Sequence, residues 1–231
     1  MRTLCITLAA IAAALTAHVG DRLRDQKLAG TPGRPLIRLR HPPMRYAFAE
    51  AQTHEHTPGT FRLLSFGRLL PYKGLDLLAE SLRLLGSRPG LSIRVVGFGP
   101  ESRELDELRG LPGVTVENRW VPETEVGALF SWSDAVVLPY REASQSGVAA
   151  VALAAHRRVV ATNVGGLSEQ LGDEPLAILC EPDAASLANG LRRVLDTRSC
   201  EQRPPTADSG DGWRDIGQSL LDQTDALLRV R

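Results

Sequence analysis

The chain has 231 residues, of which 43% are hydrophobic and 23% are charged, a composition that suits a globular protein with a sizeable buried core. Its 27 basic residues balance its 27 acidic residues, and this neutrality gives no reason to expect a nucleic-acid partner. The cysteines, Cys5, Cys180 and Cys200, lie far apart without a C-x-x-C pair. That spacing excludes a disulfide framework and a cysteine metal site, and it favours idle thiols in a reducing cytoplasm.

Residues 1–53 offer too few predicted elements for a core of their own: two short strands, near Ile6 and at 36–39, and a helix at 19–27. The apolar run 4–15 fits the core of a weak signal peptide, or a buried strand and helix start from a domain that begins further upstream. It is too short for a confident membrane span, so membrane association is not indicated. Only Arg2 precedes the run, which favours the second interpretation and a cytoplasmic protein.

The chain from residue 61 to residue 196 alternates short apolar runs with amphipathic stretches of helical length, after a polar linker at 54–60. This alternation predicts an α/β fold, a Rossmann-like, doubly wound parallel sheet. The predicted strands are apolar almost throughout, as in sheets buried on both faces: 62–66, 92–96, 114–117, 135–138, 158–162 and 177–180. The predicted helices are 74–85, 103–108, 123–130, 146–155 and 184–195, with a short one after the glycine pair at 165–166. An exposed loop at 197–212 and a C-terminal helix at 213–231 follow.

The loop at residues 67–74 (GRLLPYKG) carries the first candidate site. Gly67 lets the backbone turn after the first predicted strand, at the sheet edge where α/β proteins bind ligands. Arg68 and Lys73 stand five residues apart beside the start of a helix, which suits a clamp for a diphosphate. Two solvated loop cations would have the same spacing, so the pattern alone leaves both interpretations open.

Two other glycine-containing loops are less specific. Gly97 and Gly99 lie in GFGP, which falls short of the dinucleotide-binding pattern G-x-G-x-x-G and is equally explained by a tight turn. In TNVGGLSEQL, residues 162–171, the glycines turn the chain into a short helix, and Glu169 is expected at the surface.

The loop at residues 138–150 (LPYREASQSGVAA) is richer in polar groups. Ser146 is expected to cap the following helix, and Gly147 to leave backbone N–H groups open to an anion or a sugar hydroxyl. Ordinary capping explains the serine equally well. Glu142 either binds a hydroxyl or pairs with Arg141.

Four segments, taken in their order and separations, resemble the retaining GT-B glycosyltransferases of the group-1, or family-4, type. They are GRLLPYKGLDLLAESL, VVGFGP, WSDAVVLPYREASQSG and VVATNVGGLSEQL. The resemblance implies that residues 61–196 form the C-terminal, nucleotide-sugar-binding domain, one half of a GT-B fold. It also implies a nucleoside-diphosphate sugar as donor substrate, with no cofactor and no metal ion, because basic side chains and helix N-termini neutralise the diphosphate.

The resemblance also assigns roles to residues. Arg68 and Lys73 match the pair that binds the donor phosphates, and Glu142 matches the first glutamate of the E-x7-E motif, which contacts the transferred sugar. Residues 118–121 occupy the place that flanks the nucleobase. The resemblance thus makes Arg68, Lys73 and Glu142 the predicted catalytic residues, and the predicted donor-binding residues are Gly67, Gly97, Gly99, Ser146 and Gly147.

The chain departs from the family pattern at three points. The second glutamate of the motif should fall at Ala150 or Val151, and neither side chain can accept a hydrogen bond. His156 and Arg157 replace the usual glycine and small residue before the next strand. The family's acceptor-binding N-terminal domain is matched by only about fifty residues, so residues 1–53 are expected to be its remnant.

These observations predict a glycosyltransferase that moves a sugar from a nucleoside-diphosphate donor to an unidentified acceptor hydroxyl with retention. The alternative is a non-catalytic module that binds a nucleotide sugar, or docks onto a separate acceptor-binding domain or subunit, as in a split glycosyltransferase. A generic flavodoxin-like binding domain is the third hypothesis, but it leaves the four ordered motifs unexplained.

Overall fold

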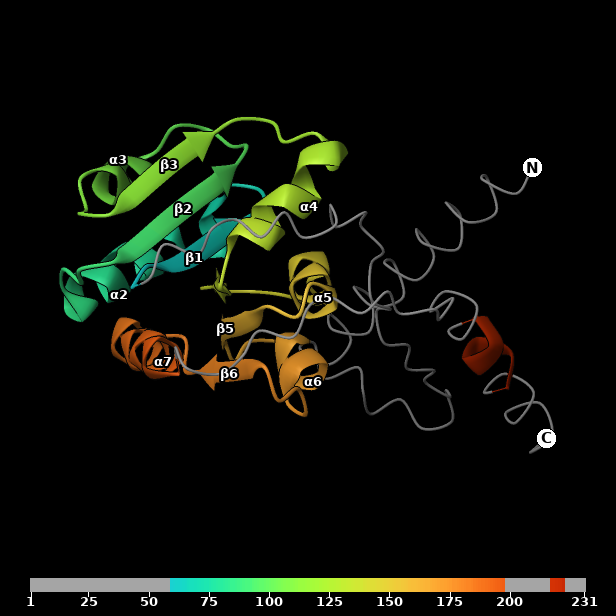
Figure 1. Ribbon diagram of the computed structural model, residues 1–231. Coiled ribbons are helices and arrows are strands. Elements are labelled where there is room, and N and C mark those ends of the chain that lie inside the picture. The colour runs from blue at the N-terminus through green and yellow to red at the C-terminus, as the bar shows by residue number, and fades with distance from the viewer. Residues whose placement is uncertain (1–58, 198–216, 223–231) are drawn as a thin grey trace. The chain divides into compact units, whose positions relative to one another are not determined.

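A computed structural model describes residues 59–197 and 217–222 of the chain (Figure 1). Residues 59–197 contain six parallel strands in the order β3-β2-β1-β4-β5-β6. The strands are β1 (Phe61–Phe66), β2 (Leu91–Gly97), β3 (Val114–Asn118), β4 (Ala135–Leu138), β5 (Arg158–Thr162) and β6 (Ala177–Cys180). The predicted Rossmann-like α/β fold is therefore confirmed, and every predicted strand lies within one residue of its observed bounds.

A 3-10 turn, η2 (Pro71–Lys73), and five α-helices connect the strands, and a sixth α-helix, α7 (Ala184–Asp196), follows β6. The five connecting helices are α2 (Leu75–Leu85), α3 (Arg103–Arg109), α4 (Glu123–Trp132), α5 (Gly147–Ala154) and α6 (Leu167–Leu171). Residues 217–222 are helical and are described separately. The predictions for residues 1–53 and for most of 54–60, 197–212 and 213–231 lie outside the described residues.

The helices cover the two faces of the sheet in groups of three (Figure 1). Buried leucines of α2, α3 and α7 pack in one cluster with Leu63 of β1, whereas α4, α5 and α6 pack in a second cluster with Leu64. Consecutive residues of a strand point to opposite faces. The strands are apolar at nearly every position because both faces are buried.

The order in which successive strands are added to the sheet reverses between β1 and β4, which pair in parallel. From β1 the chain builds outward through β2 to β3, and it then returns so that β4 pairs with β1 on the other side. In open α/β sheets, ligands bind beyond the carboxyl ends of the strands at such a reversal of the strand order. Two of the candidate loops, 67–74 after β1 and the one that begins at Pro139 after β4, flank this point.

Candidate functional site

The loop after β1 is held by its backbone and presents its cations at the carboxyl edge of the sheet. Leu69 is buried, and its N–H donates to the carbonyl of Phe98 at 3.0 Å. Gly74 has a left-handed φ of 66°, and a Cβ there would lie 1.8 Å from the carbonyl oxygen of Pro139. The loops after β1 and β4 therefore touch at Gly74, and α2 starts at Leu75 rather than at the predicted residue 74.

Arg68 and Lys73 gather around one tyrosine of the same loop. The Arg68 Nη2 donates to the Tyr72 hydroxyl at 2.8 Å, and the Lys73 Nζ lies 5.1 Å from the centroid of the Tyr72 ring. Neither cation forms an ion pair with an acidic residue in the part of the chain that the structure describes. A pair of cations without a carboxylate between them attracts anions.

Lys73 is the more buried of the two cations. Burial, and then the positive charge of Arg68, lower the pKa of Lys73 from 10.5 to about 8. The faces of Tyr140 and Tyr72 act in the opposite direction, because the electron-rich face of a ring stabilises an ammonium. An anion at this place would favour the charged form further.

The loop after β4 leads into the N-terminus of α5. The predicted N-cap is confirmed: the Ser146 Oγ accepts from the N–H of Ala149 at 3.2 Å. The N–H of Ser146 is itself engaged, since it donates to the Gln170 Oε1 at 2.9 Å, and Gln170 Nε2 donates back to the Ser146 carbonyl at 3.0 Å. Open N–H groups at this helix start can therefore come from Gly147 and Val148, not from Ser146.

Arg141 and Glu142 do not pair, so that alternative of the sequence analysis is wrong. The Arg141 Nε donates to the Asp76 Oδ1 at 3.2 Å and its Nη2 to the other carboxylate oxygen, and this contact holds the pKa of Asp76 below its ordinary value. The N–H of Arg141 also donates to the Tyr72 carbonyl at 2.9 Å. Glu142 is exposed and has no hydrogen-bond partner among the described residues, which leaves its carboxylate open to a ligand.

Gly97 and Gly99 have a packing role at the end of β2. A Cβ at Gly97 would lie 1.7 Å from the Gly67 carbonyl oxygen, and one at Gly99 would lie 2.1 Å from that of Leu69. The Asn118 side chain holds this turn by accepting from the Gly99 N–H at 3.1 Å and donating to its carbonyl at 3.0 Å. Close backbone approach is sufficient to require both glycines, and their contact with a donor stays a prediction.

Sequence reasoning missed the two tyrosines and Gln170. Tyr140 is buried, its ring centroid lies 3.6 Å from the Lys73 Nζ, and burial raises its pKa to about 12. Tyr72 contacts both cations, because its hydroxyl accepts a hydrogen bond from Arg68 and its ring faces the Lys73 ammonium. The available signal was that each tyrosine stands next to a candidate charged residue, Lys73 or Arg141, in loops already singled out.

The sequence model of one protein family, "Glycosyl transferases group 1", matches residues 60–197, which is more than half of the chain. The chain belongs to this family. The matched range contains the whole six-stranded sheet and every loop of the candidate site.

Three relatives within the group 1 glycosyltransferases illustrate the similarity. Glycogen synthase from Mycobacterium tuberculosis (strain ATCC 25618 / H37Rv) is 35% identical over 150 residues, covering 63% of this chain and 36% of that protein. GDP-mannose:glycolipid 4-beta-D-mannosyltransferase from Xanthomonas campestris pv. campestris (strain ATCC 33913) is 31% identical over 200 residues, covering 82% of this chain and 56% of that protein. D-inositol 3-phosphate glycosyltransferase from Arthrobacter sp. (strain FB24) is 33% identical over 183 residues, covering 74% and 44%. The chain thus spans between 36% and 56% of the length of these relatives.

Solved structures of other proteins share the fold. Sucrose-phosphate synthase from Thermosynechococcus elongatus superimposes with a TM-score of 0.56 at 23% identity, over 80% of this chain and 47% of that one. The catalytic domain of starch synthase IV from Arabidopsis thaliana, bound to ADP and acarbose, superimposes with a TM-score of 0.56 at 14% identity, over 75% of this chain and 40% of that one. At these identities the likeness establishes the fold.

The residues by which this group 1 chain departs from the family pattern lie in and after α5. Ala150 and Val151, where the second glutamate was expected, are both buried. His156, in place of a glycine, has a φ of 52°, in the left-handed region that favours glycine. Arg157 is buried, donates to the Ser131 carbonyl at 3.3 Å, and has its pKa lowered by burial.

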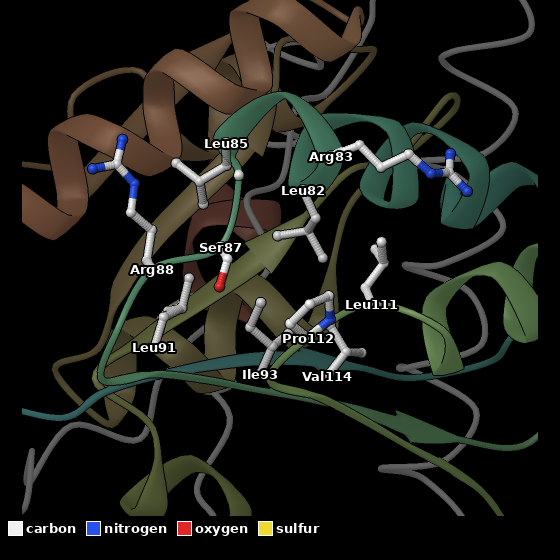
Figure 2. A pocket seen from close by; sticks show the side chains of 11 residues that line it. Leu82, Arg83, Leu85, Ser87, Arg88, Leu91, Ile93, Leu111, Pro112 and Val114 are labelled. Atoms are coloured by element: carbon white, nitrogen blue, oxygen red, sulfur yellow. The ribbon is translucent and has the colours of Figure 1, made fainter.

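A pocket of about 210 Å³ lies away from these loops, at the amino edge of the sheet. Its walls come from the end of α2 and from the first residues of β2 and β3, including Leu82, Ile93 and Val114. Aliphatic side chains gather around it, whereas the guanidinium groups of Arg83 and Arg88 point away (Figure 2). It offers few polar groups to orient a ligand, so it is not the candidate site.

Within residues 59–197 and 217–222, no helix is long and apolar enough to cross a membrane. The same residues hold no group of three or more His, Cys, Asp or Glu side chains that could bind a metal ion.

Proposed function

We propose that the carboxyl edge of the sheet binds the diphosphate of a nucleotide sugar, and that the chain is the donor-binding part of a retaining glycosyltransferase. The observation that carries the proposal is the placement of Arg68 and Lys73. Two cations without an acidic partner in the described residues stand where the strand order reverses, beside the loop that leads into α5. Family membership supports the same function.

The chemistry follows from the charge that develops when the sugar leaves. As the bond between the sugar and the diphosphate breaks, negative charge grows on the phosphate oxygens. Arg68 and Lys73 stabilise this charge, and the open N–H groups at the start of α5 add to it. No metal ion is required in this scheme.

Glu142 contacts the transferred sugar in this proposal. Its exposed carboxylate follows Arg141 in a loop that is tied to α2 by Asp76. The oxygen of an acceptor hydroxyl then bonds to the sugar on the face that the diphosphate leaves, and the proton of this hydroxyl passes to the departing diphosphate. The names of the relatives support a sugar donor of this kind, since one of them uses GDP-mannose.

The alternative function is a module that binds a nucleotide sugar and leaves the transfer to a separate acceptor-binding domain or subunit. The observation behind it is that the buried residues Ala150 and Val151 stand where the family's second glutamate was expected, so the candidate site lacks that carboxylate. Incubation of the purified chain with nucleotide sugars and acceptors decides between the two. Transfer supports the enzyme, and binding without turnover supports the module.

Binding itself is tested by thermal unfolding with ADP, GDP, UDP and pyrophosphate. A ligand at 100 times its dissociation constant stabilises the folded state by about 2.7 kcal/mol, which gives a clear rise in melting temperature. We expect this rise in the wild type and its loss in an Arg68→Ala/Lys73→Met double variant. An Arg88→Ala/Arg103→Ala variant removes the same charge elsewhere and should keep the rise. A chain that none of the four ligands stabilises would contradict the proposal.

A further inference from the structure

Tyr140 connects two parts of the candidate site that come from different strands. It follows β4, it is only 3% exposed, and its carbonyl accepts from the Thr162 Oγ1 at 2.5 Å. Its ring centroid lies 3.6 Å from the Nζ of Lys73. Its hydroxyl lies 3.5 Å from the Oγ of Ser146, the N-cap of α5.

The ring is well placed to hold the ammonium. In the described residues the Lys73 ammonium has no hydrogen bond or ion pair, so the faces of the two tyrosines are the contacts that fix its position. A cation–π contact strengthens when water is excluded, and Tyr140 is buried. The charged groups nearby are Arg68, which repels the ammonium, and the pair of Asp76 and Arg141, whose charges are already matched.

We propose that Tyr140 is a positioning residue for the diphosphate site. Its ring holds the Lys73 ammonium beside the start of α5, and its hydroxyl holds the Ser146 cap, so that cation and helix terminus face the same anion. The inference rests on the proposed function, because it concerns the binding of that diphosphate. Tyr140 acts through Lys73 and Ser146 and need not touch the ligand.

The first experiment is a double-mutant cycle that measures pyrophosphate affinity by calorimetry in the full chain. Tyr140→Phe keeps the ring and should stay within about threefold of the wild type. Tyr140→Leu removes the ring and should weaken binding about tenfold, and Tyr140→Met serves in its place if that variant does not fold. In a Lys73→Met background, the change from tyrosine to leucine should alter affinity by no more than about threefold, because the ring has lost its partner and only the hydroxyl contact with Ser146 is removed. An equal loss in both backgrounds would overturn the inference.

The second experiment needs no ligand. The rate at which acetic anhydride labels Lys73 is followed against pH by mass spectrometry. Wild type and Tyr140→Phe should share one midpoint, whereas Tyr140→Leu should shift it by about 0.5 pH units or more. An unchanged midpoint in Tyr140→Leu overturns the inference. A wild type that labels as expected but binds no diphosphate overturns the proposed function instead.

Discussion

At the carboxyl edge of the sheet the loops lie backbone against backbone and present two cations, whereas at the amino edge the loops around β2 and β3 leave a pocket lined by aliphatic side chains. The pocket at the amino edge has few polar groups, whereas the two cations of the candidate site lie at the carboxyl edge. Helices in a parallel α/β fold begin near the carboxyl edge, so the partial positive charge of their N-termini accumulates there. The proposed diphosphate site therefore rests on cations that have no acidic partner in the described residues, and not on the volume of a pocket.

The contact between the two loops at the carboxyl edge is tested by Gly74→Ala. The new methyl group meets the Pro139 carbonyl at 1.8 Å in a left-handed backbone conformation, so one of the loops has to move. We expect the free energy of unfolding to fall by about 4 kcal/mol or more, measured by urea denaturation. Gly86→Ala is the comparison variant. Its φ of 74° and ψ of 172° lie in a backbone region that is almost confined to glycine, but nothing lies within 4 Å of the new methyl group, so it should lose only about 2 kcal/mol through backbone strain. Equal losses would show that the loop contact is not tight.

A substitution in the pocket at the amino edge should lower the stability of the protein without changing its affinity for pyrophosphate. Ile93 lines the pocket and is buried to 2% exposure, so Ile93→Ala removes core contacts and should lower the free energy of unfolding by about 3 kcal/mol. Pyrophosphate affinity, measured at a temperature where the variant is fully folded, should stay within twofold of the wild type. A large loss of affinity would mean that the two edges are coupled, and the comparison would fail.

The affinity for a diphosphate should depend on pH through Lys73. With a pKa of about 8 in the free protein, Lys73 is charged below that pH and must take up a proton to bind an anion above it. The affinity for ADP, whose phosphates are already ionised over this range, should therefore fall about tenfold between pH 7.5 and 9.5. Lys73→Met should bind more weakly with little change over this range. The same fall in Lys73→Met would contradict the role of this ammonium.

As the pH rises, ligand affinity should fall, whereas the contribution of Lys73 to the stability of the ligand-free protein should increase. Unfolded chain holds the Lys73 proton up to its ordinary pKa of 10.5, whereas the folded protein releases it near 8. Between these values the unfolded state binds more protons, so the Lys73 contribution to the free energy of unfolding rises with pH. Urea titrations of wild type and Lys73→Met at pH 7.5 and 9.5 separate this effect from ligand affinity.

The sheet was predictable from sequence because each of its strands is a short apolar run bounded by turn residues. The order of the strands was not, since alternating strands and helices do not specify which strands pair. The contact of Lys73 with Tyr140 depends on that order, as 67 residues separate them in sequence and only the pairing of β1 with β4 brings their loops together. The 3-10 turn at Pro71–Lys73 was missed for another reason: three residues are too few to show a helical period.

The smallest change in the free energy of unfolding is expected for a substitution at His156. This residue lies where the chain leaves α5, at the amino edge of the sheet before β5. The N–H of His156 donates to the Leu153 carbonyl at 2.9 Å, which places the residue in the turn that ends the helix. Its φ of 52° strains a side chain with a Cβ, whereas glycine adopts this conformation freely but loses more entropy on folding. These terms partly cancel, so His156→Gly should raise the free energy of unfolding by about 0.5 kcal/mol.

Ala155→Gly is the matched control in the same turn. Its φ of −81° is ordinary for any residue, so glycine brings only entropy and the loss of a buried methyl group, and the variant should be less stable by about 1 kcal/mol. Urea midpoints of the two variants should therefore move in opposite directions from the wild type. Pyrophosphate affinity should be unchanged in both, because this turn lies at the edge of the sheet opposite Arg68 and Lys73. A drop in affinity in His156→Gly would show that the histidine acts on the site through α5, whose first turn carries the Ser146 cap.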